Sequence, residues 1–282
     1  MTSQIKTALL LVLLSGIVLL IGVATGGRGG LLVALGIALV MNVGSYWYSD
    51  KIVLRMYKAR EVSTSEAPML HAAVEELAAK AGIPKPKVCI VPDQTPNAFA
   101  TGRNPENAVV AVTEGILRVL NPEELRGVLA HEIAHIANRD ILIQSVAGVM
   151  ATVIMFMGNM LKFTAIFGGR REGEGTNPIA TLVLAIIAPL AATLVQMAIS
   201  RSREYLADES GARYCRNPNA LASALDKLGN ANQQRPMQEA NQATAHMCIV
   251  SPLAGGRSMA SLFSTHPPME ERIRRLKAMN VQ

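Results

Sequence analysis

The chain has 282 residues, enough for one ordinary domain with additions or for two small ones. Half of these residues are apolar and only 17% are charged, which is too apolar for a typical soluble domain and indicates a membrane protein. The net charge of +6 does not require a nucleic-acid partner, because lysines and arginines beside a membrane attract anionic lipid headgroups.

The first two apolar blocks, residues 8–24 and 31–48, are separated by a short glycine-rich stretch. Each is about as long as a membrane-spanning helix, roughly 17–25 residues. The second block ends in an aromatic cluster, "YWY", which is typical of a membrane interface. A cleaved signal peptide is the alternative for the first block, but its apolar core exceeds the usual range of about 7–15 residues. We therefore expect a retained transmembrane hairpin over residues 1–50.

Two further apolar blocks, at residues 145–161 and 179–199, predict a second hairpin over residues 141–200. Asn159, Lys162 and Pro189 interrupt these blocks, so the sequence leaves open whether this hairpin crosses the bilayer completely. Basic residues favour one side of the four blocks, which is expected to be the cytoplasmic side. That side carries Lys6, Lys51, Arg55, Lys58, Arg60, Arg139, Arg201 and Arg203, against Arg28, Lys162, Arg170 and Arg171 on the other.

Between the two hairpins the pattern predicts a helix followed by a small β-sheet. Residues 65–83 repeat apolar side chains at helical spacing, with Ser65 as the expected cap and Gly82 near the expected end. His71, within this helix, is expected to be solvent-facing or partly buried. Three β-like runs follow, at residues 87–91, 97–101 and 108–117, separated by proline, glycine and asparagine.

The next helix has a well-marked start: Asn121 is the expected cap, Pro122 takes the first helical position, and two acids follow. This helix runs almost directly into the third apolar block. Residues 198–215, after the fourth block, also look helical. Residues 229–264 predict a long mobile loop or lid, and the tail ends in a short amphipathic helix. The fold class is thus mainly α with a small β-sheet in a multi-spanning membrane protein.

The stretch "HEIAH" within the well-marked helix carries the chemistry. His131 and His135 are four residues apart, so they share one face of the helix and can both bind one Zn²⁺. Glu132 projects beside that face, where it can touch a metal-bound water without binding the metal. Zinc lowers the pKa of such a water towards about 7, and a carboxylate can then accept its proton as the water attacks a carbonyl.

A surface pair of histidines beside a glutamate would give the same pattern, so a third ligand matters. Zinc in a hydrolase usually has three protein ligands and an open position. His135 lies about 9 Å of helix rise before the third apolar block, and Glu204 lies about 7.5 Å after the fourth. If the two blocks form an antiparallel hairpin, His135 and Glu204 lie at a similar height above the membrane. Glu204 is therefore the expected third ligand, and a salt bridge to Arg201 or Arg203 is the alternative.

Asp208 lies one helical turn beyond Glu204 and shares its face. Metal-bound histidines commonly donate their second N–H to a carboxylate. We therefore expect Asp208 to orient one of the two histidines.

The motifs "HEIAH" and "REYLAD" resemble those of the membrane-bound gluzincin peptidases typified by HtpX, with the CaaX prenyl proteases as more distant relatives. The resemblance covers most of the chain. It implies one zinc ion per subunit, held by His131, His135 and Glu204, with Glu132 as general base and Asp208 as the aspartate of the family's E-x-x-x-D element. It also implies a role in the quality control of membrane proteins under stress. Together with the distribution of basic residues, this predicts an inner-membrane enzyme whose active site faces the cytoplasm.

Three further positions follow from the resemblance. "NAFATG" resembles the family's substrate-binding edge strand, whose asparagine corresponds to Asn97. "THPPMEERI" resembles a C-terminal element in which a histidine and an arginine face the site, here His266 and Arg272. An edge strand can bind a peptide by strand addition, and His266 and Arg272 could stabilise the oxyanion.

The expected partners are the lipid bilayer and polypeptide substrates, unfolded or membrane-bound. We expect four segments: the hairpin at 1–50, a first catalytic part at 51–140, the second hairpin at 141–200, and a second catalytic part at 201–282. The alternative function is a membrane scaffold or sensor with a structural zinc site, which usually needs four protein ligands. Cys215 is the one cysteine near Glu204 in sequence; it, Cys89 and Cys248 are expected to be free thiols.

Overall fold

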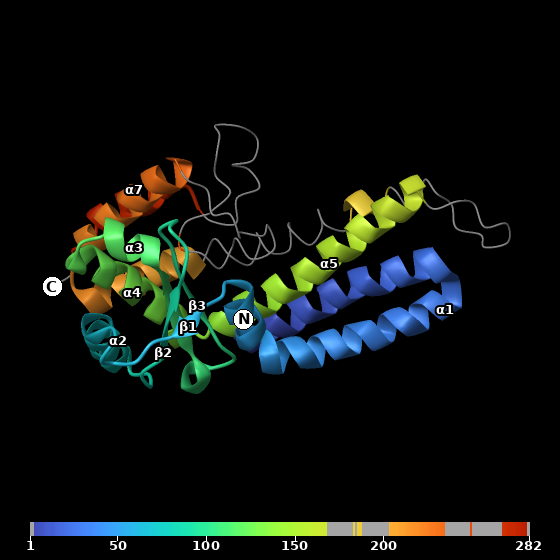
Figure 1. The fold of residues 1–282 in the computed structure, drawn as a ribbon, viewed down its shortest axis with the longest axis horizontal. Helices are drawn as coiled ribbons and strands as arrows, with labels where there is room; N and C mark the ends of the chain where they lie inside the picture. Colours follow the sequence, from blue (N-terminus) through green and yellow to red (C-terminus); the bar gives the residue numbers. More distant parts are fainter. Residues whose placement is uncertain are drawn as a thin grey trace.

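The computed structural model describes residues 3–167, 183, 185–187, 203–234, 249 and 267–280. They form two parts (Figure 1): a rod made of helices α1 and α5, and a head that holds the other elements. The C-terminus lies at the end of the head that is far from the rod. The described chain is mostly helical with one small mixed sheet, as the sequence predicts.

The first two apolar blocks form an antiparallel hairpin within α1 (Ser3–Met56), which turns back at Gly26 and Gly27. Gly27 has φ 51° and ψ −132°, a backbone conformation that glycine adopts at little steric cost. The two arms touch near the turn, because a Cβ added at Gly30 would lie 2.1 Å from the Gly22 carbonyl oxygen. Further along, the Asn42 amide donates to the Ser15 hydroxyl at 3.0 Å.

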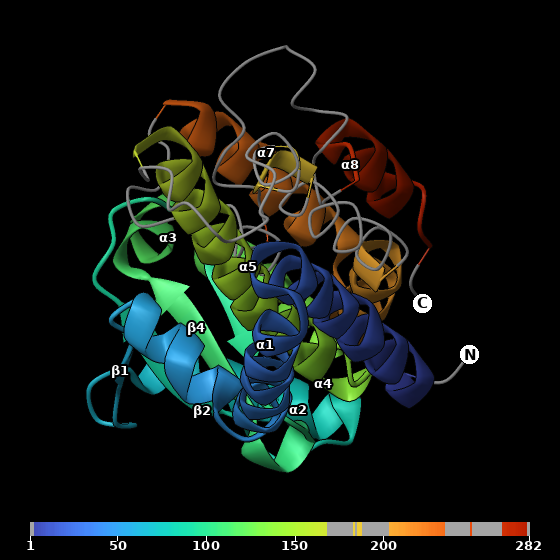
Figure 2. The same ribbon diagram turned by 90° about the vertical axis from the view of Figure 1, so that its right-hand side faces the viewer.

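Helix α5 (Ile141–Phe167) packs along this hairpin, as the view down the rod shows (Figure 2). The buried apolar side chains between them come from all three arms: Leu14, Val18, Ile21, Ala34, Ala38, Ile143, Val146, Ala147, Met150 and Ile154. Within the described residues, two stretches are long and apolar enough to cross a membrane, Leu11–Tyr48 and Ile141–Asn159. The second of these stretches includes most of the third apolar block and begins at Ile141, the expected start of the second hairpin. The fourth, at 179–199, lies outside the described residues except for Val183 and Ala185–Ile187, which are helical.

The sheet in the head has the order β1-β2-β4-β3, formed by Arg60–Glu61, Lys87–Val91, Val109–Thr113 and Ala98–Thr101 respectively. β2 and β4 are parallel and the other pairs are antiparallel. β3 is therefore an edge strand. It is joined to the rod by a buried hydrogen bond between the hydroxyls of Thr101 and Ser145, at 2.8 Å.

The strand expected at 108–117 is longer than the observed strand β4. β4 ends at Thr113, whose hydroxyl accepts a hydrogen bond from the Ile116 backbone N–H and so caps helix α3 (Glu114–Val119). The strand β1 was not predicted, because two charged residues carry no β pattern. A 3₁₀ turn, Pro105–Asn107, joins β3 to β4.

Helix α2 (Pro68–Ala81) starts three residues after the expected cap Ser65 and ends at Gly82, which has φ 67°. Of the two expectations for His71, burial rather than exposure to solvent is the one that the structure supports. His71 is buried, and its Nε2 lies 3.0 Å from the Val62 carbonyl oxygen, so this histidine joins α2 to the chain that follows β1.

Helix α4 (Pro122–Ala137) begins where the sequence predicts, with a reciprocal capping box. The Asn121 side chain accepts from the Glu124 backbone N–H at 2.9 Å, and the Glu124 carboxylate accepts from the Asn121 N–H at 3.0 Å. Glu124 also accepts from Ser223 at 2.7 Å and Lys227 at 2.8 Å, both on α7 (Pro218–Gln234). One carboxylate thus caps α4 and attaches it to α7.

Of the remaining described elements, the helix at 203–215 lies against α4 and α8 packs against α7. Residues 203–215 are helical, and α8 (Met269–Lys277) is the short terminal helix that the sequence predicts. The expected start of a loop at Gly229 is wrong, because α7 continues to Gln234. Of the rest of the expected loop, 229–264, only Ile249 lies within the described residues.

Replacing Glu124 by alanine removes both the cap and the link to α7. We expect the free energy of unfolding to fall by about 1–2 kcal/mol, measured by chemical denaturation of the purified protein in detergent. Glu123→Ala is the matched control, because Glu123 lies in the same helical turn and is exposed. Equal losses for the two variants would contradict this role of Glu124.

Candidate active site

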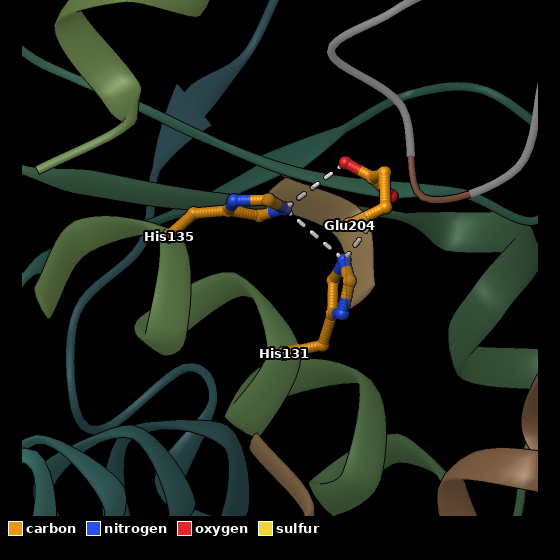
Figure 3. Close-up of side chains that lie close together, drawn as sticks. All are labelled: His131, His135 and Glu204. Carbon is orange, nitrogen blue, oxygen red and sulfur yellow. Dashed lines mark hydrogen bonds and ion pairs between the residues drawn. The ribbon is translucent and has the colours of Figure 1, made fainter. Parts of the chain in front are cut away.

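The two histidines of the H-E-x-x-H motif lie on the buried face of α4, one helical turn apart. Their rings are nearly perpendicular, with centroids 4.7 Å apart, and the two Nε2 atoms are 3.2 Å from each other (Figure 3). Both Nε2 atoms point to the same space. Helical spacing therefore produces the convergence that the sequence predicts.

Glu204, on the helix at 203–215, brings its carboxylate to that space (Figure 3). Its Oε1 lies 3.4 Å from His135 Nε2 and its Oε2 lies 3.7 Å from His131 Nε2. The helix can approach α4 this closely because of Gly211: a Cβ there would lie 2.8 Å from the His131 backbone nitrogen. All three side chains are buried.

The three donors fit a divalent cation such as zinc. They lie within 4.8 Å of one another, and two ligand atoms about 2.0–2.1 Å from a tetrahedral zinc ion are roughly 3.3–3.4 Å apart. The observed separations of 3.2, 3.4 and 3.7 Å bracket that value. Two imidazoles and a carboxylate are also a common ligand set for zinc in hydrolases.

Behind His131, Asp208 and Arg272 form a buried chain of charged groups. His131 Nδ1 lies 2.9 Å from Asp208 Oδ1, and Arg272 donates two hydrogen bonds to the Asp208 carboxylate, at 2.8 and 2.7 Å. Burial alone would raise the pKa of Asp208, but the charge and hydrogen bonds of Arg272 outweigh it and hold that pKa below its usual range. Asp208 is thus an ionised acceptor facing the His131 ring.

Behind His135 lies a carboxylate that our reading of the sequence missed. His135 Nδ1 is 3.5 Å from Asp140 Oδ2, and Asp140 Oδ1 is 3.7 Å from Arg203 Nε. The chain turns at Arg139, with φ 59°, and the Asp140 N–H donates to the His135 carbonyl at 2.9 Å. The signal in the sequence was an acid directly before an apolar block, where a helix needs a cap.

Glu132 is 2% exposed and lies between α4 and the edge strand. Burial raises the pKa of its carboxyl to about 7, although nearby His135 and a hydrogen bond from the Ala100 backbone N–H act in the opposite direction. The carboxylate is therefore held beside β3 as well as beside the histidine pair.

Asn97 lies at the start of the same edge strand and is fully buried. Its side-chain oxygen accepts from the Ala98 backbone N–H at 2.9 Å, while its Nδ2 has no hydrogen-bond partner. The Ala98 carbonyl accepts from the Ile249 N–H at 3.1 Å. One part of the strand edge is thus already paired within the chain.

The two residues expected to face the oxyanion have different outcomes. His266 lies outside the described residues. Arg272 is fully buried: besides its bonds to Asp208 it donates to the Ile249 carbonyl at 3.0 Å, and its Nη1 lies 3.4 Å from Glu204 Oε2. Arg272 therefore lies between Asp208, which is behind His131, and Glu204, which belongs to the cluster of three donors.

A fourth protein ligand, which a structural zinc site usually has, is absent from the cluster among the described residues. The Sγ of Cys215 is directed to the carbonyl oxygens of Ala212 and Asn217, at 3.6 and 3.5 Å. Cys89 and Cys215 are free thiols, as expected, and Cys248 lies outside the described residues.

Replacing Gly211 by alanine would place a methyl group against the His131 backbone and push Glu204 away from the histidines. We expect a destabilisation of about 1–3 kcal/mol together with weaker zinc binding, measured by thermal denaturation and by metal content after dialysis. Gly229→Ala in α7 is the control, since its Cβ would meet only Met269 Cγ, at 3.8 Å. That change should be neutral or stabilising, so identical behaviour of the two variants would contradict the close-approach argument.

Comparison with known proteins agrees with this geometry. Residues 64–280 match the model of peptidase family M48. Three similar proteins, each described as a protease HtpX homolog, come from Syntrophobacter fumaroxidans, Pyrococcus furiosus and Persephonella marina. Their identities are 55, 56 and 57%; the alignments cover 99, 99 and 98% of this chain and 100, 96 and 96% of the relatives.

The crystal structure of Ste24p from S. mikatae has a similar fold, with a TM-score of 0.52 at 19% identity. The similarity covers 93% of this chain but 62% of Ste24p. The resemblance to the HtpX family that the sequence motifs indicate is confirmed. With its apolar helices and its cluster of two histidines and a glutamate, the chain belongs to peptidase family M48 and is a membrane-associated metalloprotease.

Proposed function

We propose that this protein is a zinc endopeptidase embedded in the inner cell membrane, which cleaves misfolded or membrane polypeptides on the cytoplasmic side. The observation that carries the proposal is that three side chains meet in one cluster although they are far apart in the sequence. His131 and His135 come before residues 141–200, and Glu204 comes after them. Bound by these three residues, zinc would supply a Lewis acid and lower the pKa of a water at its open position.

Glu132 is the group that accepts the proton of the attacking water and passes it to the leaving amine. It lies next to His131 on α4 but outside the cluster of three donors, which suits a base rather than a ligand. The hydrogen bond from the Ala100 N–H supports a fixed position for its carboxylate. A fixed general base contributes roughly 10²–10⁴-fold to the rate.

The substrate is held in extended form along the edge of β3. Because the Asn97 carbonyl pairs with the Thr113 N–H on β4, backbone groups of Ala98 and Ala100 point away from β4. A peptide that adds to this edge passes Glu132, since Glu132 contacts Ala100. The unpaired, buried Nδ2 of Asn97 supplies a donor for a substrate carbonyl.

Arg272 and Asp208 position His131, and Arg272 does so instead of donating to the oxyanion. Its hydrogen bonds to Asp208 and to the Ile249 carbonyl support this assignment. His266 remains our candidate for the oxyanion donor, on the resemblance of its motif alone.

The active site lies close to the membrane surface. Only residues 138–140 separate the metal-binding helix α4 from α5, which is apolar enough to span a bilayer. This short connection supports access to polypeptides that emerge from the membrane. The four-segment division and the cytoplasmic orientation rest on the apolar blocks and on the distribution of basic residues. The role in protein quality control rests on the resemblance to HtpX.

Replacing Glu132 by glutamine should leave zinc bound and lower the cleavage rate by about 10²–10⁴-fold, because the amide cannot accept the proton. The rate is measured with an unfolded casein-like substrate in detergent, and zinc is measured by elemental analysis. Glu123→Gln, on the exposed face of the same helix, is the control. Normal activity of the Glu132→Gln enzyme would contradict the proposed mechanism.

Chelation should abolish cleavage, and Zn²⁺ added afterwards should restore it at one ion per chain. Glu204→Ala should lower the zinc content, because it removes one of three ligands. Glu209→Ala, on the same helix and exposed, should bind zinc normally. Full activity in the presence of chelator would overturn the assignment of a zinc enzyme.

A further inference from the structure

The two metal-binding histidines have similar surroundings on the side away from the metal position. Each ring directs Nε2 to the shared space with Glu204 and Nδ1 to a buried aspartate, Asp208 for His131 and Asp140 for His135. Each aspartate in turn faces a buried arginine. We propose that Asp140 and Arg203 are positioning residues for His135, as Asp208 and Arg272 are for His131. This inference rests on the proposed function, in which His131 and His135 hold the metal.

The burial of Arg203 is the first argument for a specific role. Its position just after an apolar block suggests a cation at the membrane surface, yet it is 4% exposed. A buried guanidinium is destabilising unless a carboxylate compensates its charge. Asp140, with Oδ1 3.7 Å from Nε, and the neighbouring Glu204 are the acids that act on Arg203.

The second argument is the long distance between Arg203 and Asp140. Charged N–H···O hydrogen bonds are about 2.7–2.9 Å long, as between Arg272 and Asp208. The contact between Arg203 and Asp140 is longer, and Arg203 Nη1 and Nη2 and Asp140 Oδ2 have no hydrogen-bond partner. These three atoms can each form a further hydrogen bond next to the His135 ring. The contacts of Asp140 and Arg203 behind His135 are therefore weaker than those of Asp208 and Arg272 behind His131.

Asp140 and Arg203 are each linked to one of the proposed metal ligands, His135 and Glu204. Asp140 lies at the junction of α4 and α5, where its N–H is bonded to the His135 carbonyl and its carbonyl accepts from the Gln144 N–H. Arg203 directly precedes Glu204 in the chain. The ion pair thus joins the start of α5 to the start of the helix at 203–215, and a shift in either helix changes the direction of the His135 ring.

The test is zinc affinity of the full chain in detergent, measured by competition with a chromophoric chelator. Removing a carboxylate behind a metal-bound histidine typically weakens binding by roughly 10–100-fold. We expect Asp140→Asn to lie near the lower end of that range, Asp208→Asn near the upper end, and Arg203→Gln below Asp140→Asn. The controls are Asp226→Asn on α7 and Arg213→Gln on the helix at 203–215, both at exposed positions.

The double variant Asp140→Asn/Arg203→Gln tests whether the two residues act together. If Arg203 acts through Asp140, the double variant should bind zinc no more weakly than Asp140→Asn alone. If the two losses of zinc affinity multiply in the double variant, the proposal that Arg203 acts through Asp140 is wrong. The absorption spectrum of the Co²⁺-loaded protein should change in Asp140→Asn, because the ligand field depends on the direction of the His135 ring.

A merely structural ion pair would give a different result. The melting temperature of the metal-free protein would then fall in both single variants while zinc affinity stayed at the wild-type value, and that result would overturn the proposal. A wild-type protein that binds no zinc would instead overturn the proposed function. The two failures are therefore distinguishable.

Discussion

The structure depends on the close contact between two helices that are far apart in the sequence. The helix at 203–215 lies against α4 with no side chain between them at Gly211, where its backbone approaches that of His131. This contact brings Glu204 to within 3.4 and 3.7 Å of the two imidazoles. The capping box of α4 and the link from Glu124 to α7 hold the other end of the same helix. Helix α4 is therefore held both at its start and beside His131.

The price of this arrangement is a concentration of charge inside the head. Glu132, Asp140, Arg203, Glu204, Asp208 and Arg272 are all buried. Buried charges are tolerated when they are paired and hydrogen-bonded. Asp208 and Arg272 meet this condition fully through paired hydrogen bonds. Asp140 and Arg203 meet it only in part, which is a feature of a functional site rather than of a core optimised for stability.

The sequence predicts the parts of the fold that depend on local patterns. The apolar blocks, the capped start of α4 and the H-E-x-x-H spacing all follow from residue type and helical geometry. Glu204 could be proposed because two apolar blocks of similar length were expected to form a hairpin that returns the chain to the same height. The end of β4 was missed because Thr113 is both a good strand residue and a good cap. The pairing of Asp140 with His135 depends on the turn at Arg139, which has no signature among the motifs.

The edge strand has one further property. The Ala98 carbonyl already accepts a hydrogen bond from the chain's own Ile249, so a polypeptide that uses this oxygen must take the place of an internal partner. Exchanging one backbone hydrogen bond for another yields little net free energy. Any net gain from strand addition would therefore have to come from contacts made beyond Ala98, and backbone contacts of this kind need no pocket for a particular side chain.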